Sequence, residues 1–375
     1  MKRITFIFFC TFLMAAVFAV AGTPDQNARL IQAAEQGIIA DVEGALTNGA
    51  DINAIIPKKY YDFFVRNVTA LMMASQNGHK EIVKLLLDKG ADVNLKTSNK
   101  VTALMMASES GHKEVVKLLL DKGADVNMKT SSDNLTALMM ASEKGYVDII
   151  RLLLDKGADV NVETNSTNQT ALVIASKNGY ADVIKLLLDK GAKVNTKSGS
   201  DKLTALMLSS ENGFTTVVKL LLDNGADVNA KTMFLNETAL TMASEKGHEA
   251  IVKLLLDKGA HVNVKTSNDD ATALILASKE GHTDVVRLLL DAGADVKAES
   301  AEKNIRALML ASKGGHAEIV KILLDKGADV NAANADGITA LMMAAQGGHV
   351  KVIKLLLDKD ADVNVINADG ITALM

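Results

Sequence analysis

The histidines are the residues of this sequence whose possible chemistry is most easily judged from their spacing. Six of the seven follow a glycine at one point of a repeated segment, and Tyr146, Tyr180 and Phe214 take that place in other copies. A position shared by three ring types requires a ring-sized side chain rather than a metal ligand. Stacked helices lie about 8–10 Å apart, whereas zinc needs each nitrogen at about 2.0–2.1 Å. We therefore predict packing roles for His79, His112, His248, His282, His316 and His349.

The remaining catalytic motifs are incomplete or missing from the sequence. His248-Glu249 begins a zinc-protease motif, but Val252 stands where its second histidine must be. The sequence contains no phosphate-binding loop, no G-x-G-x-x-G and no G-x-S-x-G, and Cys10 is its only cysteine. We predict a protein that is not an enzyme and that needs no cofactor or metal.

The elements that position these residues come from a fixed repeat. The triplet Thr-Ala-Leu begins at Thr69, Thr102, Thr136, Thr170, Thr204, Thr238, Thr272, Thr339 and Thr372, and Arg306 replaces the threonine once. Successive copies are always about 33 or 34 residues apart, a period that is typical of solenoid proteins. We expect one elongated domain rather than several globular ones.

One copy, residues 102–134, predicts two short helices and a turn. Thr102 can cap a helix over 103–110 with its hydroxyl, and Gly111 can end it in a left-handed conformation. A second helix over 112–121 places Val115, Val116, Leu119 and Leu120 on one face. Helices this short are not stable alone, so each pair must stack on its neighbours.

This unit resembles an ankyrin repeat. Its second half, GHKEVVKLLLDKGADVN, recurs with few changes between Gly78 and Asn364, while Thr-Ala-Leu-Met stands where the family has Thr-Pro-Leu-His. The resemblance implies an all-α repeat solenoid of stacked helix-turn-helix units with hairpin-like finger turns. It also implies a protein partner, bound by the finger tips and the concave face of the first helices.

The first residues have the pattern of a signal peptide. Met1-Lys2-Arg3 is basic, Ile4 to Val20 is almost wholly apolar, and Ala19-Val20-Ala21 is a small-x-small cleavage site. We predict cleavage before Gly22 and an exported protein, either periplasmic or secreted. The alternative is an uncleaved membrane anchor, because the apolar run approaches the length of a short span.

The charge of the chain argues against a nucleic-acid partner. The net charge is −4, and removal of the two basic residues of the signal peptide makes it more negative. Acidic and basic residues alternate along the chain, whereas a nucleic-acid surface requires a basic stripe. A protein is the expected partner.

The repeat spacing predicts the domain boundaries. The signal peptide covers 1–21 and the solenoid covers 22–375, with ten helix pairs and a truncated eleventh unit. Residues 27–53 form a capping repeat, because a first helix carrying Arg29, Gln32, Glu35 and Gln36 suits an end without a neighbour. Residues 54–68 form an extended finger, 69–364 hold repeats two to ten, and 365–375 begin a partial repeat whose first helix is cut short.

Two fingers carry side chains suited to binding a partner. The extended finger holds Tyr60, Tyr61, Phe63 and Phe64, and aromatic residues dominate binding hot spots. This loop could instead fold back and cover the first groove. A later finger places Met233-Phe234-Leu235 where other fingers place Ser, Asn or Asp. That apolar tip is either a contact site or packs onto an adjacent finger.

The residue pairs before each Gly-His-like step vary between nearly identical copies, so we expect them to contribute to the binding surface. These pairs are Gln76-Asn77, Glu109-Ser110, Glu143-Lys144, Lys177-Asn178 and Lys279-Glu280.

Three further patterns concern stability. Recurring methionine pairs such as Met72-Met73 are expected to fill the core. Lys84 and Asp88 are expected to pair along the exposed face of one helix, for about 0.3–0.5 kcal/mol. Leu220 and Leu221 of a middle repeat are both expected to be buried.

Together these features predict an exported, non-catalytic scaffold for protein–protein interaction. The alternatives are a secreted effector or a structural spacer of the cell envelope, and, last, an enzyme whose site matches no known motif.

Overall fold

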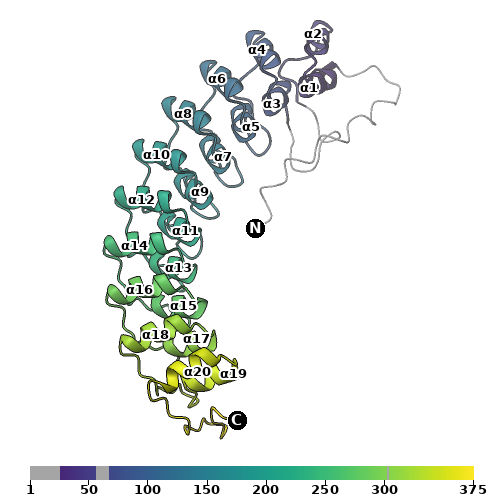
Figure 1. Cartoon of the computed structure of the whole chain (residues 1–375). Coiled ribbons are helices and arrows are strands. Elements are labelled where there is room, and N and C mark those ends of the chain that lie inside the picture. The colour runs from purple at the N-terminus through teal and green to yellow at the C-terminus, as the bar shows by residue number, and fades with distance from the viewer. Residues whose placement is uncertain (1–25, 56–66, 302–303) are drawn as a thin grey trace. The chain divides into compact units, whose positions relative to one another are not determined.

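The computed structural model describes residues 26–55, 67–301 and 304–375 (Figure 1). The chain divides into two compact units, with the boundary between Asp125 and Val126. Helix pairs make up both units, as the repeat predicts. The first unit contains α1 (Gln26–Gln36), α2 (Ile39–Thr47), α3 (Ala70–Gln76), α4 (Lys80–Asp88), α5 (Ala103–Ser110) and α6 (Lys113–Asp121). 

The second unit contains α7 (Ala137–Lys144), α8 (Val147–Asp155), α9 (Ala171–Asn178), α10 (Ala181–Asp189), α11 (Ala205–Glu211), α12 (Thr215–Asp223), α13 (Ala239–Glu245), α14 (Glu249–Asp257), α15 (Ala273–Glu280), α16 (Thr283–Asp291), α17 (Ala307–Lys313), α18 (Ala317–Asp325), α19 (Ala340–Gln346) and α20 (Val350–Leu357). Within this unit the odd-numbered helices pack on one another in one row and the even-numbered helices in a second row (Figure 1). The described residues thus contain twenty helices, which stack in pairs as an ankyrin-like solenoid requires.

Local sequence sets where each first helix begins. Thr102 has extended backbone geometry, and its hydroxyl accepts a hydrogen bond from the Met105 amide at 3.3 Å. Most of the other first helices have the same cap, which satisfies one of the amides that a helix start leaves unpaired. Arg306 provides no side-chain cap to α17, where the Met309 amide bonds to the Arg306 carbonyl instead.

The core lies between the two rows of helices and between successive repeats. In α6 the predicted face is buried, with Val115, Val116, Leu119 and Leu120 at most 6% exposed. Met72 and Met73 are buried as well, so the prediction that methionine pairs fill the core is confirmed for this repeat. The prediction for α12 was half wrong: Leu221 is fully buried, but Leu220 is only partly buried, and Leu222 takes the second core position.

Successive repeats are joined by the histidines that were predicted to pack. The Nε2 atom of His112 lies 2.9 Å from the carbonyl oxygen of Gln76 in the preceding repeat, and since a carbonyl only accepts, Nε2 donates. His79, His248, His282, His316 and His349 make the same bond at 2.9–3.2 Å. The ring fits because Gly78 has a positive φ of 74° and no side chain, whereas a Cβ there would approach His112 Nδ1 to 2.5 Å. These histidines therefore bind the neighbouring helix end as well as fill space.

Ion pairs also join repeats, where pairing within a helix was expected. The ammonium of Lys122 lies 2.8 Å from the Asp88 carboxylate, in the next repeat rather than one turn away. The hydrogen bond from Lys122 is the main cause that holds the pKa of Asp88 below its ordinary value. The positive charges of Lys122 and Lys84 lower this pKa further. Equivalent pairs join Asp155 to Lys190, Asp223 to Lys258, Asp291 to Lys326 and Asp325 to Lys359.

The two ends of the described chain differ from the middle repeats. In α1 the residues Leu30, Ile31 and Ala34 are buried, while Arg29 is exposed. Residues 365–375 form turns, so the expectation that this segment enters a first helix was wrong. None of the described helices is long and apolar enough to cross a membrane.

Candidate protein-binding surface

The finger before α13 is a tight backbone hairpin. The amide of Thr232 donates to the Glu237 carbonyl at 2.9 Å, and the Glu237 amide donates to the Thr232 hydroxyl at 3.0 Å. Asn236 closes the turn with a φ of 54°, a left-handed conformation that asparagine tolerates better than most residues. This geometry places Met233, Phe234 and Leu235, here named the Met-Phe-Leu tip, at the end of the finger.

Both neighbouring fingers hold the backbone of this tip. Asp201 accepts the Met233 amide on its carbonyl at 2.9 Å and the Phe234 amide on its Oδ1 at 2.8 Å. On the other side the Ser267 amide donates to the Leu235 carbonyl at 2.8 Å. The tip backbone is therefore fixed before any partner arrives.

The side chains of the tip remain open to solvent. Met233 is 62% exposed, Phe234 60% and Leu235 37%, so none of them is buried against an adjacent finger. Scattered apolar residues on a surface are ordinary, but three consecutive ones on a rigid tip form a contiguous apolar patch. Such a tip can enter an apolar pocket with little loss of backbone entropy.

Carboxylates surround the base of this finger. Partial burial raises the pKa of Glu237, and the charges of Glu245, Asp201 and Glu211 raise it further. The charge of Lys246 opposes them and does not outweigh them. The charges that act on Glu237 are therefore mainly negative.

The variable pairs lie at the other ends of the first helices. A first helix of seven or eight residues separates them from the finger tips by about 11 Å at 1.5 Å per residue. Glu143 is partly exposed, Lys144 and Lys177 are exposed, and Gln76 is partly exposed.

The asparagines of these pairs have structural partners. The side-chain amide of Asn77 donates to the Met73 carbonyl at 3.0 Å, and that of Asn178 donates to the Ile174 carbonyl at 3.1 Å. Both therefore satisfy carbonyls at a helix end. In a further pair the ammonium of Lys279 lies 3.2 Å from the Glu280 carboxylate.

Other predicted site residues lie outside the described residues. They are the aromatic group Tyr60, Tyr61, Phe63 and Phe64 and the cleavage-site residues Ala19 and Ala21. Among the described residues, no three His, Cys, Asp or Glu side chains are grouped so that they could hold a metal ion.

Comparison with known proteins identifies the family. The sequence model for ankyrin repeats (three copies) matches residues 30–130, 128–198, 206–300, 265–334 and 308–375. This chain belongs to the ankyrin repeat family. Ankyrin repeats generally mediate the binding of protein partners.

Individual relatives agree with this family. The crystal structure of the human ASB11 ankyrin repeat domain is 28% identical and superposes with a TM-score of 0.54, over 61% of this chain and 99% of that one. The ankyrin repeat and KH domain-containing protein mask-1 of Caenorhabditis elegans is 43% identical over 75 residues, or 20% of this chain. The aligned part spans only 2% of mask-1, so the likeness concerns the ankyrin repeats alone.

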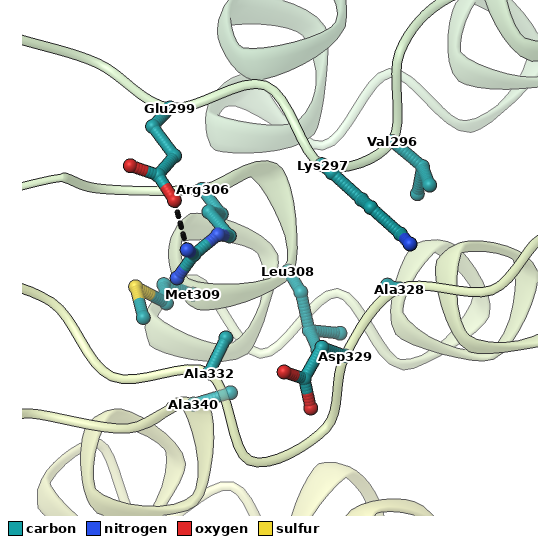
Figure 2. Close-up of a pocket in the computed structure, with 10 residues that line it drawn as sticks. All are labelled: Val296, Lys297, Glu299, Arg306, Leu308, Met309, Ala328, Asp329, Ala332 and Ala340. Atoms are coloured by element: carbon teal, nitrogen blue, oxygen red, sulfur yellow. Dashed lines mark hydrogen bonds and ion pairs between the residues drawn. The ribbon is translucent and has the colours of Figure 1, made fainter.

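A second candidate site lies where one ankyrin repeat departs from its copies. A pocket of about 240 Å³ opens between the loop before α17 and the loop before α19 (Figure 2). The charged groups that line the pocket belong to Lys297, Glu299, Arg306 and Asp329. Figure 2 shows the Arg306 guanidinium turned toward Glu299. Sequence reasoning noted Arg306 but missed Lys297, although Lys297 stands where the other nine copies have asparagine.

Proposed function

We propose that this chain is an exported, non-catalytic ankyrin repeat scaffold that binds a protein partner through the Met-Phe-Leu tip and the adjoining first helices. The observation that carries the proposal is the tip itself, whose backbone is held from both sides while Met233 and Phe234 are more than half exposed. The proposal of export rests on the sequence pattern of residues 1–21.

The energetics favour this tip as the centre of an interface. Full burial of a methionine or phenylalanine side chain stabilises by about 1.5–3 kcal/mol, and the tip begins mostly exposed. Its fixed backbone reduces the entropy that binding would otherwise cost. A small number of such anchors is enough for a specific interface.

The chain itself offers a replacement for the tip. The next finger has Ser267-Asn268-Asp269 at the same place, so the triple variant M233S/F234N/L235D copies a finger that this fold already contains. The variant keeps backbone donors and acceptors on both sides of the finger. We expect it to fold normally and to weaken partner capture by at least about tenfold, or about 1.4 kcal/mol.

The matched control is Val350→Ser, which removes an apolar residue with 61% exposure from the start of a second helix. Capture would be measured with purified protein and extracellular or periplasmic extract from the source cells. Equal capture by the native chain and the triple variant would exclude the tip as the binding site. For export, N-terminal sequencing of the secreted form should give Gly22 as the first residue, and recovery of Met1 in the membrane fraction would instead support an anchor.

A further inference from the structure

The turns after the second helices are joined by a ladder of asparagines. Asn229 is typical: its Nδ2 donates to the Gly259 carbonyl at 3.2 Å, and its Oδ1 accepts the His261 amide at 2.8 Å. One side chain thus satisfies a donor and an acceptor of the following repeat. The same two bonds are made by Asn94, Asn127, Asn161, Asn195, Asn263 and Asn331.

Lys297 interrupts this ladder. An ammonium group has no acceptor, so it cannot replace the oxygen that would receive the Asp329 amide. Within the described residues, neither the Asp329 amide nor the Lys297 ammonium has a protein partner. The side chain of Lys297 runs along the pocket wall toward Ala328 (Figure 2).

Arg306 is the second departure, and it lines the same pocket. It replaces the threonine that caps the other first helices after the first pair. Its guanidinium pairs with the Glu299 carboxylate and also donates to the Ala333 carbonyl at 3.4 Å. Two basic residues that break the repeat pattern therefore meet at one pocket.

The partners of the charged groups decide which ligand the pocket suits. The Glu299 carboxylate is occupied by Arg306, and Oδ1 of Asp329 accepts the Asn331 amide at 3.0 Å. Among the described residues, the donors left without a protein partner are the Lys297 ammonium and the Asp329 amide, and the second carboxylate oxygen of Asp329 is an acceptor that also has none. Donors of this kind bind a carboxylate through charge-assisted hydrogen bonds.

The size of the pocket limits the ligand further. Its volume of about 240 Å³ is below the roughly 300–1,000 Å³ of small-molecule sites. One side chain fits this space better than a whole metabolite. The lining also contains the apolar groups Leu308, Met309 and Ala340, which suit the methylene groups of a glutamate.

We propose that the pocket between Lys297 and Arg306 binds the carboxylate of an acidic side chain on a polypeptide partner. Lys297 supplies the charge, the Asp329 amide supplies a fixed donor, and Arg306 offsets the charge of Glu299. The Asp329 carboxylate lies in the same lining, where its Oδ1 accepts the Asn331 amide. This site is separate from the Met-Phe-Leu tip and does not depend on the tip's role.

The probe for this site is N-acetyl-glutamate N-methylamide, compared with the glutamine analogue and with inorganic phosphate. Binding to the full chain would be followed by NMR through the methyl group of Met309 and the backbone amide of Asp329, which both belong to residues lining the pocket. We expect saturable shifts with the glutamate probe, at least tenfold weaker binding of the glutamine probe, and no saturable shift with phosphate.

Two reversions to the repeat pattern test the residues without risk to folding. Lys297→Asn restores the ladder side chain, so it should raise the melting midpoint and abolish binding of the glutamate probe. Arg306→Thr restores a helix cap but leaves Glu299 unpaired, so it should fold well and weaken binding at least fivefold. Lys219→Asn removes the same charge from the exposed face of α12 and should leave binding unchanged.

Several outcomes would overturn the proposal. Equal binding of the glutamate and glutamine probes would show that charge is not recognised, and equal binding of phosphate would indicate a general anion site. Undiminished binding by Lys297→Asn, or the absence of any saturable shift in the native chain, would show that the pocket is not a carboxylate site.

Discussion

Substitution of Leu221 by alanine tests whether stability in this chain is local to neighbouring repeats. Leu221 is fully buried on α12 and faces the core between the rows. The change removes three carbon atoms, worth about 2.4 kcal/mol at about 0.8 kcal/mol for each buried methylene. The cavity that remains raises the cost, so we expect a loss of about 3–4 kcal/mol, inside the range of about 2–5 kcal/mol for such substitutions.

The matched control is Leu220→Ala in the same helix. Leu220 is only partly buried, so much of its side chain is hydrated in both states and its removal leaves no closed cavity. We expect this variant to lose about 1 kcal/mol or less. Denaturant unfolding of both variants gives the free energies, and hydrogen exchange gives their location.

Hydrogen exchange decides whether the destabilisation stays local. In a solenoid each repeat contacts only its neighbours, so Leu221→Ala should increase exchange first in α11 to α14, while α17 to α20 keep their protection. A uniform rise across the second unit would show that this unit unfolds as one cooperative core. Equal losses for Leu220→Ala and Leu221→Ala would contradict the assignment of the buried face.

Three further substitutions test single features of the repeat. His248→Phe copies the ring at Phe214 and removes the bond to the Glu211 carbonyl, so denaturant unfolding should show a loss of about 0.5–1 kcal/mol, and no loss would mean that the ring alone matters. Asp360 has a φ of 63° where the other repeats have glycine, so its backbone is strained. Asp360→Gly should therefore raise the free energy of unfolding by about 1 kcal/mol, measured by the same denaturant unfolding. A variant that is less stable than the native chain would show that Asp360 is not strained. The pKa of Glu237 is raised from its ordinary value of 4.5, which means that ionisation of Glu237 destabilises the folded state above that pH. Glu237→Gln should therefore be more stable than the native chain at neutral pH, and the difference should vanish below pH 4.5, where the carboxyl is protonated in both states; a gap that widens in acid would reverse the assigned sign.

The helices and their core faces could be predicted because their causes are local. Thr102 caps a helix three residues away, and the apolar spacing of α6 selects one face whatever the neighbours are. Leu220 was wrongly predicted to be buried because it begins a run of three leucines. Such a run does not show which two of the three side chains face the core.

Contacts between repeats could not be predicted in this way. Lys84 lies one turn from Asp88, which favours a pair along the helix, yet Lys122 reaches Asp88 from the next repeat. The register of stacked repeats decides such pairs, and the spacing within one helix does not contain it. The same limit explains why the histidines were predicted as fillers while their hydrogen bonds to the preceding repeat were missed.

The candidate sites were likewise predictable only in those features that depend on local sequence. The composition of Met233-Phe234-Leu235 was enough to single out the tip, but its exposure and its support by Asp201 depend on the adjacent fingers. The pocket needed Lys297 and Arg306 to be considered together. Each is visible as a departure from the repeat, whereas their meeting at one cavity appears only in the fold.

Photo-crosslinking from position 234 tests the central claim, that the Met-Phe-Leu tip binds a protein, most directly. A benzoyl-phenylalanine residue at Phe234 should crosslink a distinct protein from the extract of the source cells, and an excess of unlabelled native chain should remove the crosslink. The same residue at Val350, which is equally exposed, should give none. A Phe234 variant that crosslinks no protein, or that gives the same products as the Val350 variant, would contradict the account.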